Sequence, residues 1–143
     1  MYGGRIRCNV ADDGTINAFY GDNSYREDGS NGQVMVYQPK FYYQRVPMKT
    51  TAGIVGRTIR KESLLITSTP QTGFKLHPLF KNGDEELDYV LLSAYEGALI
   101  SDKMSSIAGQ KPTSNITSET AENAAKARGT GWHITNMAAE SAS

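Results

Sequence analysis

The stretch that decides the fold is Gly73-Phe74-Lys75-Leu76-His77-Pro78-Leu79-Phe80, followed after a turn by Leu87-Asp88-Tyr89-Val90-Leu91-Leu92-Ser93-Ala94-Tyr95-Glu96-Gly97. The second segment alternates around Tyr89, Leu91 and Tyr95, which predicts the buried central strand of the core. Pro78 prevents a ladder hydrogen bond in the first segment, so we expect an ordered loop that covers one edge of that strand. The side chains expected in the core are Phe74, Leu76, Pro78, Phe80, Tyr89, Leu91, Tyr95 and Trp132.

Length and composition indicate one domain over residues 1–143 and exclude several classes of partner. The chain is 38% hydrophobic, and its fifteen basic and fifteen acidic residues cancel. A chain without net charge has no overall field to attract nucleic acid, and no apolar run is long enough for membrane insertion. Cys8 is the only cysteine, so an internal disulfide is impossible and a structural metal site is not expected. We also expect no cofactor.

The rest of the chain predicts short strands, loops and two helices. Ile6, Cys8 and Val10 alternate with polar residues ahead of an Asp-Gly turn, which predicts a hairpin over residues 5–20. The apolar run 34–46 is interrupted by Pro39, which indicates an edge strand or two short strands. The remaining expected elements are a connector at 50–56, a strand at 61–68, a long loop at 99–117, a helix at 118–128 with Gly129 as its stop, and a second helix at 131–140.

The polar segment Gly21–Gly32 is the first candidate for a binding loop. The only aromatic anchor of this loop is Tyr25, and its oxygen-bearing side chains could bind calcium, although the spacing differs from that of calcium loops. The alternative is a solvated turn. An exposed tyrosine in the run 41–43 would suit sugar stacking or a protein interface, whereas core packing is the other use of these rings. The candidate ligand-binding residues are Asp22, Asn23, Tyr25, Asp28 and Tyr42.

No catalytic arrangement stands out, and we expect a protein that is not an enzyme. His77 precedes a proline and His133 follows a tryptophan, positions that favour structural roles over a nucleophile–base pair. The acidic group 84–88 indicates a solvated turn. Its alternative is a pair of glycosidase carboxylates, and nothing in the pattern selects one pair.

Several segments, in order along nearly the whole chain, resemble a family of structural proteins of tailed bacteriophages and prophages. These segments are Arg7–Gly14, Gly29–Val36, Pro39–Tyr43, Gly73–Pro78, Ala94–Gly97 and Ala125–Trp132. The resemblance implies an α+β, C-type lectin-like fold of short antiparallel strands, two helices and long ordered loops, distantly shared with formylglycine-generating enzymes. It also implies an incomplete copy, because the family continues past the position of Ser143. The enzyme branch of that fold uses cysteine and copper chemistry, which Cys8 alone cannot reproduce.

The resemblance implies a virion protein made in the bacterial host cytoplasm, and three functions remain open. The first is an adhesion module of a tail or fibre that binds a host-surface saccharide or protein non-covalently, through loops such as 21–32 and 99–117. The second is a purely structural subunit of the head, neck or tail that mediates assembly. The third is an envelope-acting hydrolase. The expected partners are other virion proteins and further copies of the chain, with a trimer as the favoured homo-oligomer.

Overall fold

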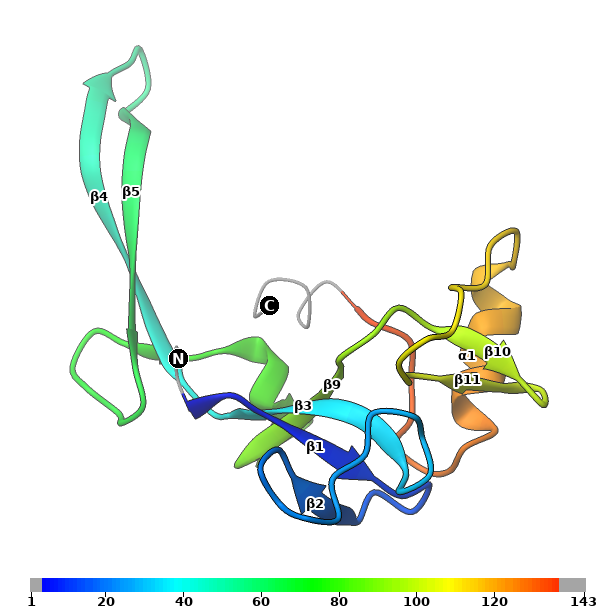
Figure 1. Cartoon of the computed structure of the whole chain (residues 1–143). Coiled ribbons are helices and arrows are strands. Elements are labelled where there is room, and N and C mark those ends of the chain that lie inside the picture. Colours follow the sequence, from blue (N-terminus) through cyan, green and yellow to red (C-terminus); the bar gives the residue numbers. More distant parts are fainter. Residues whose placement is uncertain (1–3, 137–143) are drawn as a thin grey trace. The chain divides into compact units, whose positions relative to one another are not determined.

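The computed structural model describes residues 4–136, without the side chain of Arg60. The chain divides into two compact units (Figure 1). Unit 1 contains the residues up to Gln38 and those from Val90 onward, and unit 2 contains Pro39–Tyr89.

Unit 1 is organised around a four-stranded sheet. The strands are β1 (Ile6–Val10), β2 (Ile16–Phe19), β3 (Gln33–Pro39) and β9 (Tyr89–Ser93), in the spatial order β2-β1-β3-β9. β1 pairs antiparallel with β2, which confirms the predicted hairpin, and with β3, where Cys8 lies opposite Met35. Gly14 has a φ of +88°, so the Asp-Gly turn uses the backbone freedom of glycine.

One face of this sheet forms the core of unit 1. Cys8 and Val10 are fully buried beside Met35. The partly buried side chains that pack against them are Ile16, Phe19, Tyr37, Leu91 and Trp132. The core of unit 1 therefore lies on the two central strands, β1 and β3.

The prediction of a central strand over Tyr89–Tyr95 is wrong in its placement. The segment does form strand β9, but β9 is an edge strand, and Tyr89 is 40% exposed. Alternation identifies a strand, whereas long-range pairing decides which strand lies in the middle of a sheet. Leu91 contributes to the core, and Tyr95 is half-buried.

A small hairpin and one helix complete unit 1. The hairpin consists of β10 (Ala98–Ile100) and β11 (Lys103–Ser105), and it occupies part of the segment expected to be a loop. Helix α1 (Ser118–Lys126) is the predicted helix, with the Thr117 side chain accepting from the backbone N–H of Thr120. Ala124 and Ala125 are buried, and small side chains allow the helix to lie close to β11.

The expected α+β, C-type lectin-like fold with two helices is wrong. Strands make up 41% and helices 10% of the described residues, and α1 is the only α-helix between residues 4 and 136. The expected helix 131–140 does not form over 131–136, and its remainder lies outside the described residues. Gly131 has a φ of +87°, and the backbone N–H of Ile134 donates to the Glu122 side chain instead of to a helical carbonyl.

Unit 2 consists of a long β-hairpin and a small base. The hairpin strands are β4 (Tyr42–Ala52) and β5 (Arg57–Thr67), and β6 (Lys75–Leu76) pairs with β4 only at Tyr42 and Tyr43. The base also holds a 3-10 helix (Pro78–Phe80), β7 (Lys81–Asn82) and β8 (Glu85–Glu86). The interruption predicted at Pro39 therefore separates two strands, β3 and β4.

An aromatic cluster of Phe41, His77 and Phe80 fills the base of unit 2. Phe80 is fully buried, and its ring lies 5.3 Å from that of Phe41 in an edge-to-face contact. The expected burial of Pro78 is wrong: it is exposed, because it begins the 3-10 helix, where its fixed φ suits the first turn. Phe74 and Leu76 are half-buried.

Candidate functional site

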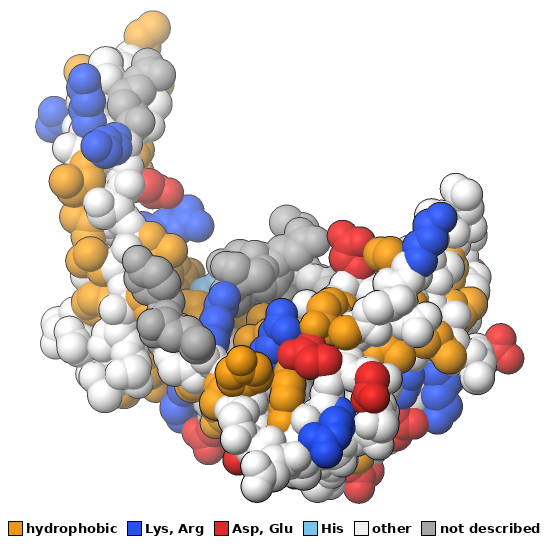
Figure 2. All heavy atoms as spheres, viewed as in Figure 1, with side chains coloured by type: hydrophobic (Ala, Val, Ile, Leu, Met, Phe, Trp, Pro, Cys, Tyr) orange, Lys and Arg blue, Asp and Glu red, His pale blue; other side chains and the backbone are white. Residues whose placement is uncertain are grey.

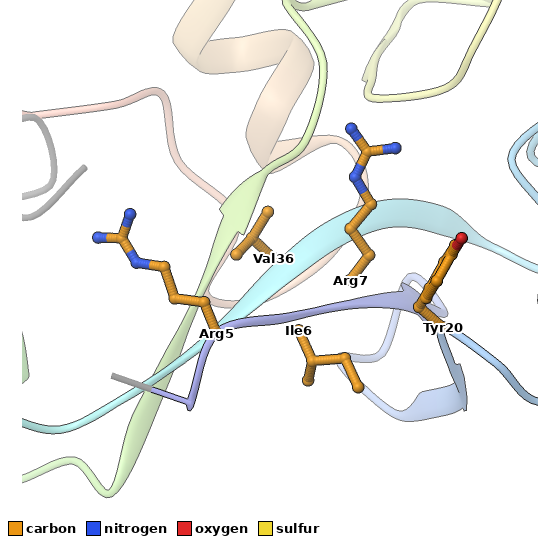
Figure 3. A pocket seen from close by; sticks show the side chains of 5 residues that line it. All are labelled: Arg5, Ile6, Arg7, Tyr20 and Val36. Carbon is orange, nitrogen blue, oxygen red and sulfur yellow. The ribbon is translucent and has the colours of Figure 1, made fainter. Parts of the chain in front are cut away.

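Unit 1 carries an open pocket of about 400 Å³ on the sheet face opposite its core (Figure 3). We call it the Arg–Tyr pocket, and the residues that line it are Arg5, Ile6, Arg7, Tyr20 and Val36. Figure 3 shows the side chains of Arg5, Arg7, Val36 and Tyr20 on one side of β1 and that of Ile6 on the other. Two arginines line the pocket, and guanidinium N–H groups are donors that suit an anionic ligand.

Strand pairing brings the lining residues together. Arg5 and Arg7 lie on the same face of β1 because side chains alternate along a strand. Val36 lies opposite Arg7 in the β1–β3 ladder, and the backbone N–H of Tyr20 donates to the Arg7 carbonyl over 2.8 Å. Tyr20 is 65% exposed, and its ring lies 5.4 Å from that of Tyr25 in an edge-to-face contact.

Arg7 is held in place by Glu27 and Tyr95. Its Nη1 donates to both carboxylate oxygens of Glu27, over 2.9 and 3.1 Å, and its guanidinium carbon lies 5.2 Å from the centre of the Tyr95 ring. The hydroxyls of Tyr25 and Tyr95 also donate to Glu27, the former over 2.7 Å. Four side chains from three parts of unit 1, namely β1, the loop 21–32 and the segment after β9, thereby form one network.

The network keeps its ion pair charged. The hydrogen bond to Glu27 is the main cause that raises the pKa of the Arg7 guanidinium. Burial acts to raise the pKa of Glu27, but the hydrogen bonds from Tyr95, Tyr25 and Arg7 outweigh it and hold that pKa below its usual range. Arg7 is therefore a fixed cation at the edge of the pocket.

The loop 21–32 is tied to the sheet next to this network. The fully buried Asn9 side chain accepts from the backbone N–H of Arg26 over 2.8 Å and donates to the Arg26 carbonyl over 2.6 Å. At the end of the loop, a Cβ on Gly32 would lie 2.5 Å from the Val10 carbonyl oxygen, so only glycine allows this approach. The loop is thus held at two points by β1.

Hydrogen bonds also fix the segment 106–108, which follows β11. Ser106 is buried, its N–H donates to the Gln33 side chain over 2.7 Å, and its hydroxyl donates to the Val34 carbonyl over 2.7 Å. The N–H of Ala108 donates to the Glu27 carbonyl over 2.8 Å. The segments 21–32 and 106–108 are therefore joined by a backbone hydrogen bond.

The predicted binding residues of loop 21–32 mostly organise the loop itself. Asp22 accepts from the Phe19 N–H over 2.7 Å, and Asp28 accepts from the N–H and hydroxyl of Ser30 over 2.9 and 2.6 Å. Asn23 is exposed and its backbone carbonyl accepts from Arg26, while Tyr25 is half-buried in the Glu27 network. Among residues 4–136, no group of three or more His, Cys, Asp or Glu side chains is arranged to hold a metal ion.

The remaining candidate, Tyr42, lies in unit 2. It is half-buried on β4, opposite Leu76 of β6 and Thr67 of β5. Sequence reasoning did not name the Arg–Tyr pocket. The alternation that predicted β1 already placed Arg5 and Arg7 on one face, but Tyr20 and Val36 join them only through the pairing of three strands.

The histidines and the cysteine are occupied by structural contacts. His77 is 6% exposed, its Nδ1 accepts from the Leu79 N–H over 3.3 Å, and burial lowers its pKa. His133 lies 3.0 Å from Glu122 on the exposed side of α1. Burial raises the pKa of the Cys8 thiol to about 11, so the thiol stays protonated at neutral pH and is a poor nucleophile.

No helix within residues 4–136 combines the length and the hydrophobicity needed to cross a membrane. Comparison of the chain with protein-family models, curated proteins and solved structures finds no match. The function is therefore inferred from the residues and contacts of the chain itself.

Proposed function

We propose that this chain is an adhesion module of a tailed-bacteriophage virion that binds a host-surface saccharide non-covalently at the Arg–Tyr pocket. The observation that carries the proposal is the largely exposed ring of Tyr20 beside the fixed cation Arg7. A rigid aromatic ring supplies contact area at small entropic cost, and sugars stack on such rings. The assignment to a virion rests on the sequence resemblance.

The charge of the pocket favours a saccharide that carries a carboxylate or a phosphate. Guanidinium groups bind such planar or tetrahedral anions through paired N–H donors. The hydrogen bonds from Arg7 to Glu27 and Tyr95 use Nη1, at one end of the guanidinium group. Val36 adds an apolar patch between the two arginines, as Figure 3 shows.

Rigid support of the pocket also favours binding. Asn9, Glu27 and Ser106 fix the neighbouring loops through buried or half-buried hydrogen bonds. A site that is already in its bound shape loses little conformational entropy when a ligand arrives. Recognition by a fixed surface is what an adhesion module needs.

The proposal is tested by binding of the full chain to an array of acidic and neutral bacterial-surface saccharides. We expect binding to acidic saccharides that weakens with salt, because exposed charge interactions are screened. Tyr20→Ala should weaken binding at least about tenfold, the effect of losing roughly 1.4 kcal/mol of contact. The control is Tyr89→Ala, which removes another exposed ring, 40% accessible, from strand β9.

Two results would contradict the proposal. One is the absence of binding to every saccharide on the array. The other is an equal loss of binding in Tyr20→Ala and Tyr89→Ala, which would show that the saccharide does not bind at the Arg–Tyr pocket. A competition assay tests the proposal on whole phage particles. Added wild-type chain should reduce adsorption of the parent phage to its host, and the Tyr20→Ala variant should not.

A second candidate function, the structural virion subunit, is favoured by a different observation. The β4–β5 hairpin of unit 2 exposes a row of large apolar side chains, which is typical of a protein-binding surface. This function does not exclude the first, since adhesion modules are themselves assembled into larger particles.

A further inference from the structure

The β4–β5 hairpin extends well beyond the base of unit 2. Each strand has eleven residues, and the only further pairing of β4 is with β6, at Tyr42 and Tyr43 (Figure 1). Past that base, the described strands β4 and β5 pair only with each other. A two-stranded ribbon is marginally stable in water unless a third layer packs on it.

Among residues 4–136, the hairpin carries most of the exposed large apolar side chains. Ile54 and Val55 at the tip are 104% and 95% exposed. The others along the strands, each at least 45% exposed, are Met48, Ile59, Leu64, Leu65 and Ile66. Successive residues of a strand point to opposite faces, so Leu64 and Leu65 make both faces apolar. Figure 2 shows hydrophobic side chains following the hairpin along its length.

The hairpin is also strongly basic, unlike the rest of the chain. Between Tyr42 and Thr67 there are five basic residues and one acidic residue, whereas the sequence of unit 1 has seven basic and ten acidic ones. Lys49 and Lys61 lie opposite each other in the β4–β5 register. Like charges in this position destabilise a hairpin, and an acidic partner surface would relieve them.

We propose that the hairpin packs on the acidic unit 1 of a second copy of this chain, which would make the protein a homo-oligomer. Two basic hairpins repel each other, so the charge distribution disfavours a symmetric hairpin-to-hairpin dimer. The contact is instead between different surfaces of the two copies, which gives a closed ring such as a trimer when the rotation closes. In this contact, the exposed apolar side chains of the hairpin supply the buried area. Its basic residues favour the acidic surface of unit 1 as the partner.

The first test is the mass of the full chain in solution, measured by light scattering and sedimentation over a range of protein and salt concentrations. We expect a discrete oligomer that dissociates as salt rises, because the contact pairs opposite charges. A monomer at all concentrations would overturn the proposal, and so would an oligomer that is insensitive to salt.

Lys61→Glu is the sharpest variant. It replaces the like-charged pair with Lys49 by an opposite-charged one, so the hairpin itself should become more stable while its attraction to an acidic surface falls. We expect an increase of at least about tenfold in the dissociation constant of the oligomer. Lys111→Glu is the matched control: it makes the same charge change in an exposed loop of unit 1, and because it makes unit 1 more acidic it should not weaken the oligomer. Equal weakening by both variants would overturn the proposal.

The apolar contribution is tested at the tip of the hairpin. The double variant Ile54→Ser and Val55→Ser removes side chains that contact almost nothing within the chain, so folding should be unchanged while the oligomer dissociates. The control is Leu99→Ser, a 37% exposed residue of β10 in unit 1. Retention of the oligomer in the tip variant would contradict the proposal. The array measures saccharide binding and light scattering measures the oligomer. Failure of the saccharide proposal is therefore distinguishable from failure of the oligomer proposal.

Discussion

Asp12 and Arg128, 116 positions apart in the sequence, form a 2.7 Å ion pair that joins the β1–β2 turn to the end of helix α1. Asp12 also accepts from Lys103 over 2.8 Å, and its backbone carbonyl accepts from the Trp132 indole over 2.8 Å. The Arg128 side chain is only 8% exposed and donates to Ser105 over 2.5 Å. One turn residue therefore connects the sheet, the β10–β11 hairpin and the C-terminal segment of unit 1.

Asp12→Asn is expected to destabilise unit 1. The substitution removes the negative charge that compensates the nearly buried Arg128, and charge-assisted hydrogen bonds contribute about 1.5–3 kcal/mol each. Denaturant unfolding should show a loss in that range. Asp13→Asn is the control, because Asp13 is exposed and accepts only a local hydrogen bond from Thr15. An equal loss in both variants would count against a special role for Asp12.

The same carboxylate gives unit 1 an acid sensitivity. The hydrogen bond from Lys103 is the main cause that lowers the pKa of Asp12 below its ordinary value of 3.8, and the bond from Arg128 adds to it. A carboxyl group with a lowered folded-state pKa stabilises the fold above its ordinary pKa, and this contribution is lost as pH falls through the folded value. Unfolding free energies measured from pH 7 to pH 2 should fall below about pH 4. In Asp12→Asn the fall should be smaller; an identical pH profile would refute the assignment.

Asn9→Ala is expected to loosen the loop 21–32. It leaves the N–H and carbonyl of Arg26 without the buried side chain that satisfies both, at an expected cost of about 1–3 kcal/mol. Limited proteolysis should cut this loop faster in the variant than in the wild type. Asn17→Ala, which removes one exposed hydrogen bond to Asn31, should leave the cleavage rate nearly unchanged.

Gly32→Ala should be more damaging than Gly14→Ala. Both glycines have positive φ, at +105° and +88°, but an added Cβ at residue 32 would lie 2.5 Å from the Val10 carbonyl, whereas nothing lies within 4 Å at residue 14. Gly14→Ala should cost roughly 1 kcal/mol for its backbone conformation alone. Gly32→Ala should cost more, because the start of β3 must also move. Thermal unfolding of the two variants measures the difference, and the reverse order would contradict this structure.

Local signals in the sequence predicted the parts of the fold that depend on neighbouring residues. The Asp-Gly turn predicted the β1–β2 hairpin, Thr117 and Gly129 bounded the helix, and Pro39 marked the end of β3. The sequence does not predict the β10–β11 hairpin, because Ser101 and Asp102 adopt positive φ without a glycine or asparagine in the turn. The segment 50–56 was expected to be a connector, but it forms the end of β4 and the tip of the long hairpin.

The candidate site was harder to predict because it depends on which strands become neighbours. Tyr20 reaches Arg7 through the pairing of β1 with the end of β2, and Val36 reaches it through β3. Glu27 belongs to the loop that the sequence marked as a candidate, yet its role depends on Tyr95, 68 positions away. The sequence pattern predicts the loop, whereas the pocket beside it depends on how β1, β2 and β3 pair.

The insertion of unit 2 between β3 and β9 has a consequence for synthesis on the ribosome. β1, β2 and β3 leave the ribosome before residues 39–89, and β9 follows only after them. The local contacts of the long hairpin can form at once, whereas the outer edge of β3 stays open until translation reaches Ser93. During that interval the nascent sheet offers unpaired backbone groups to any other extended segment.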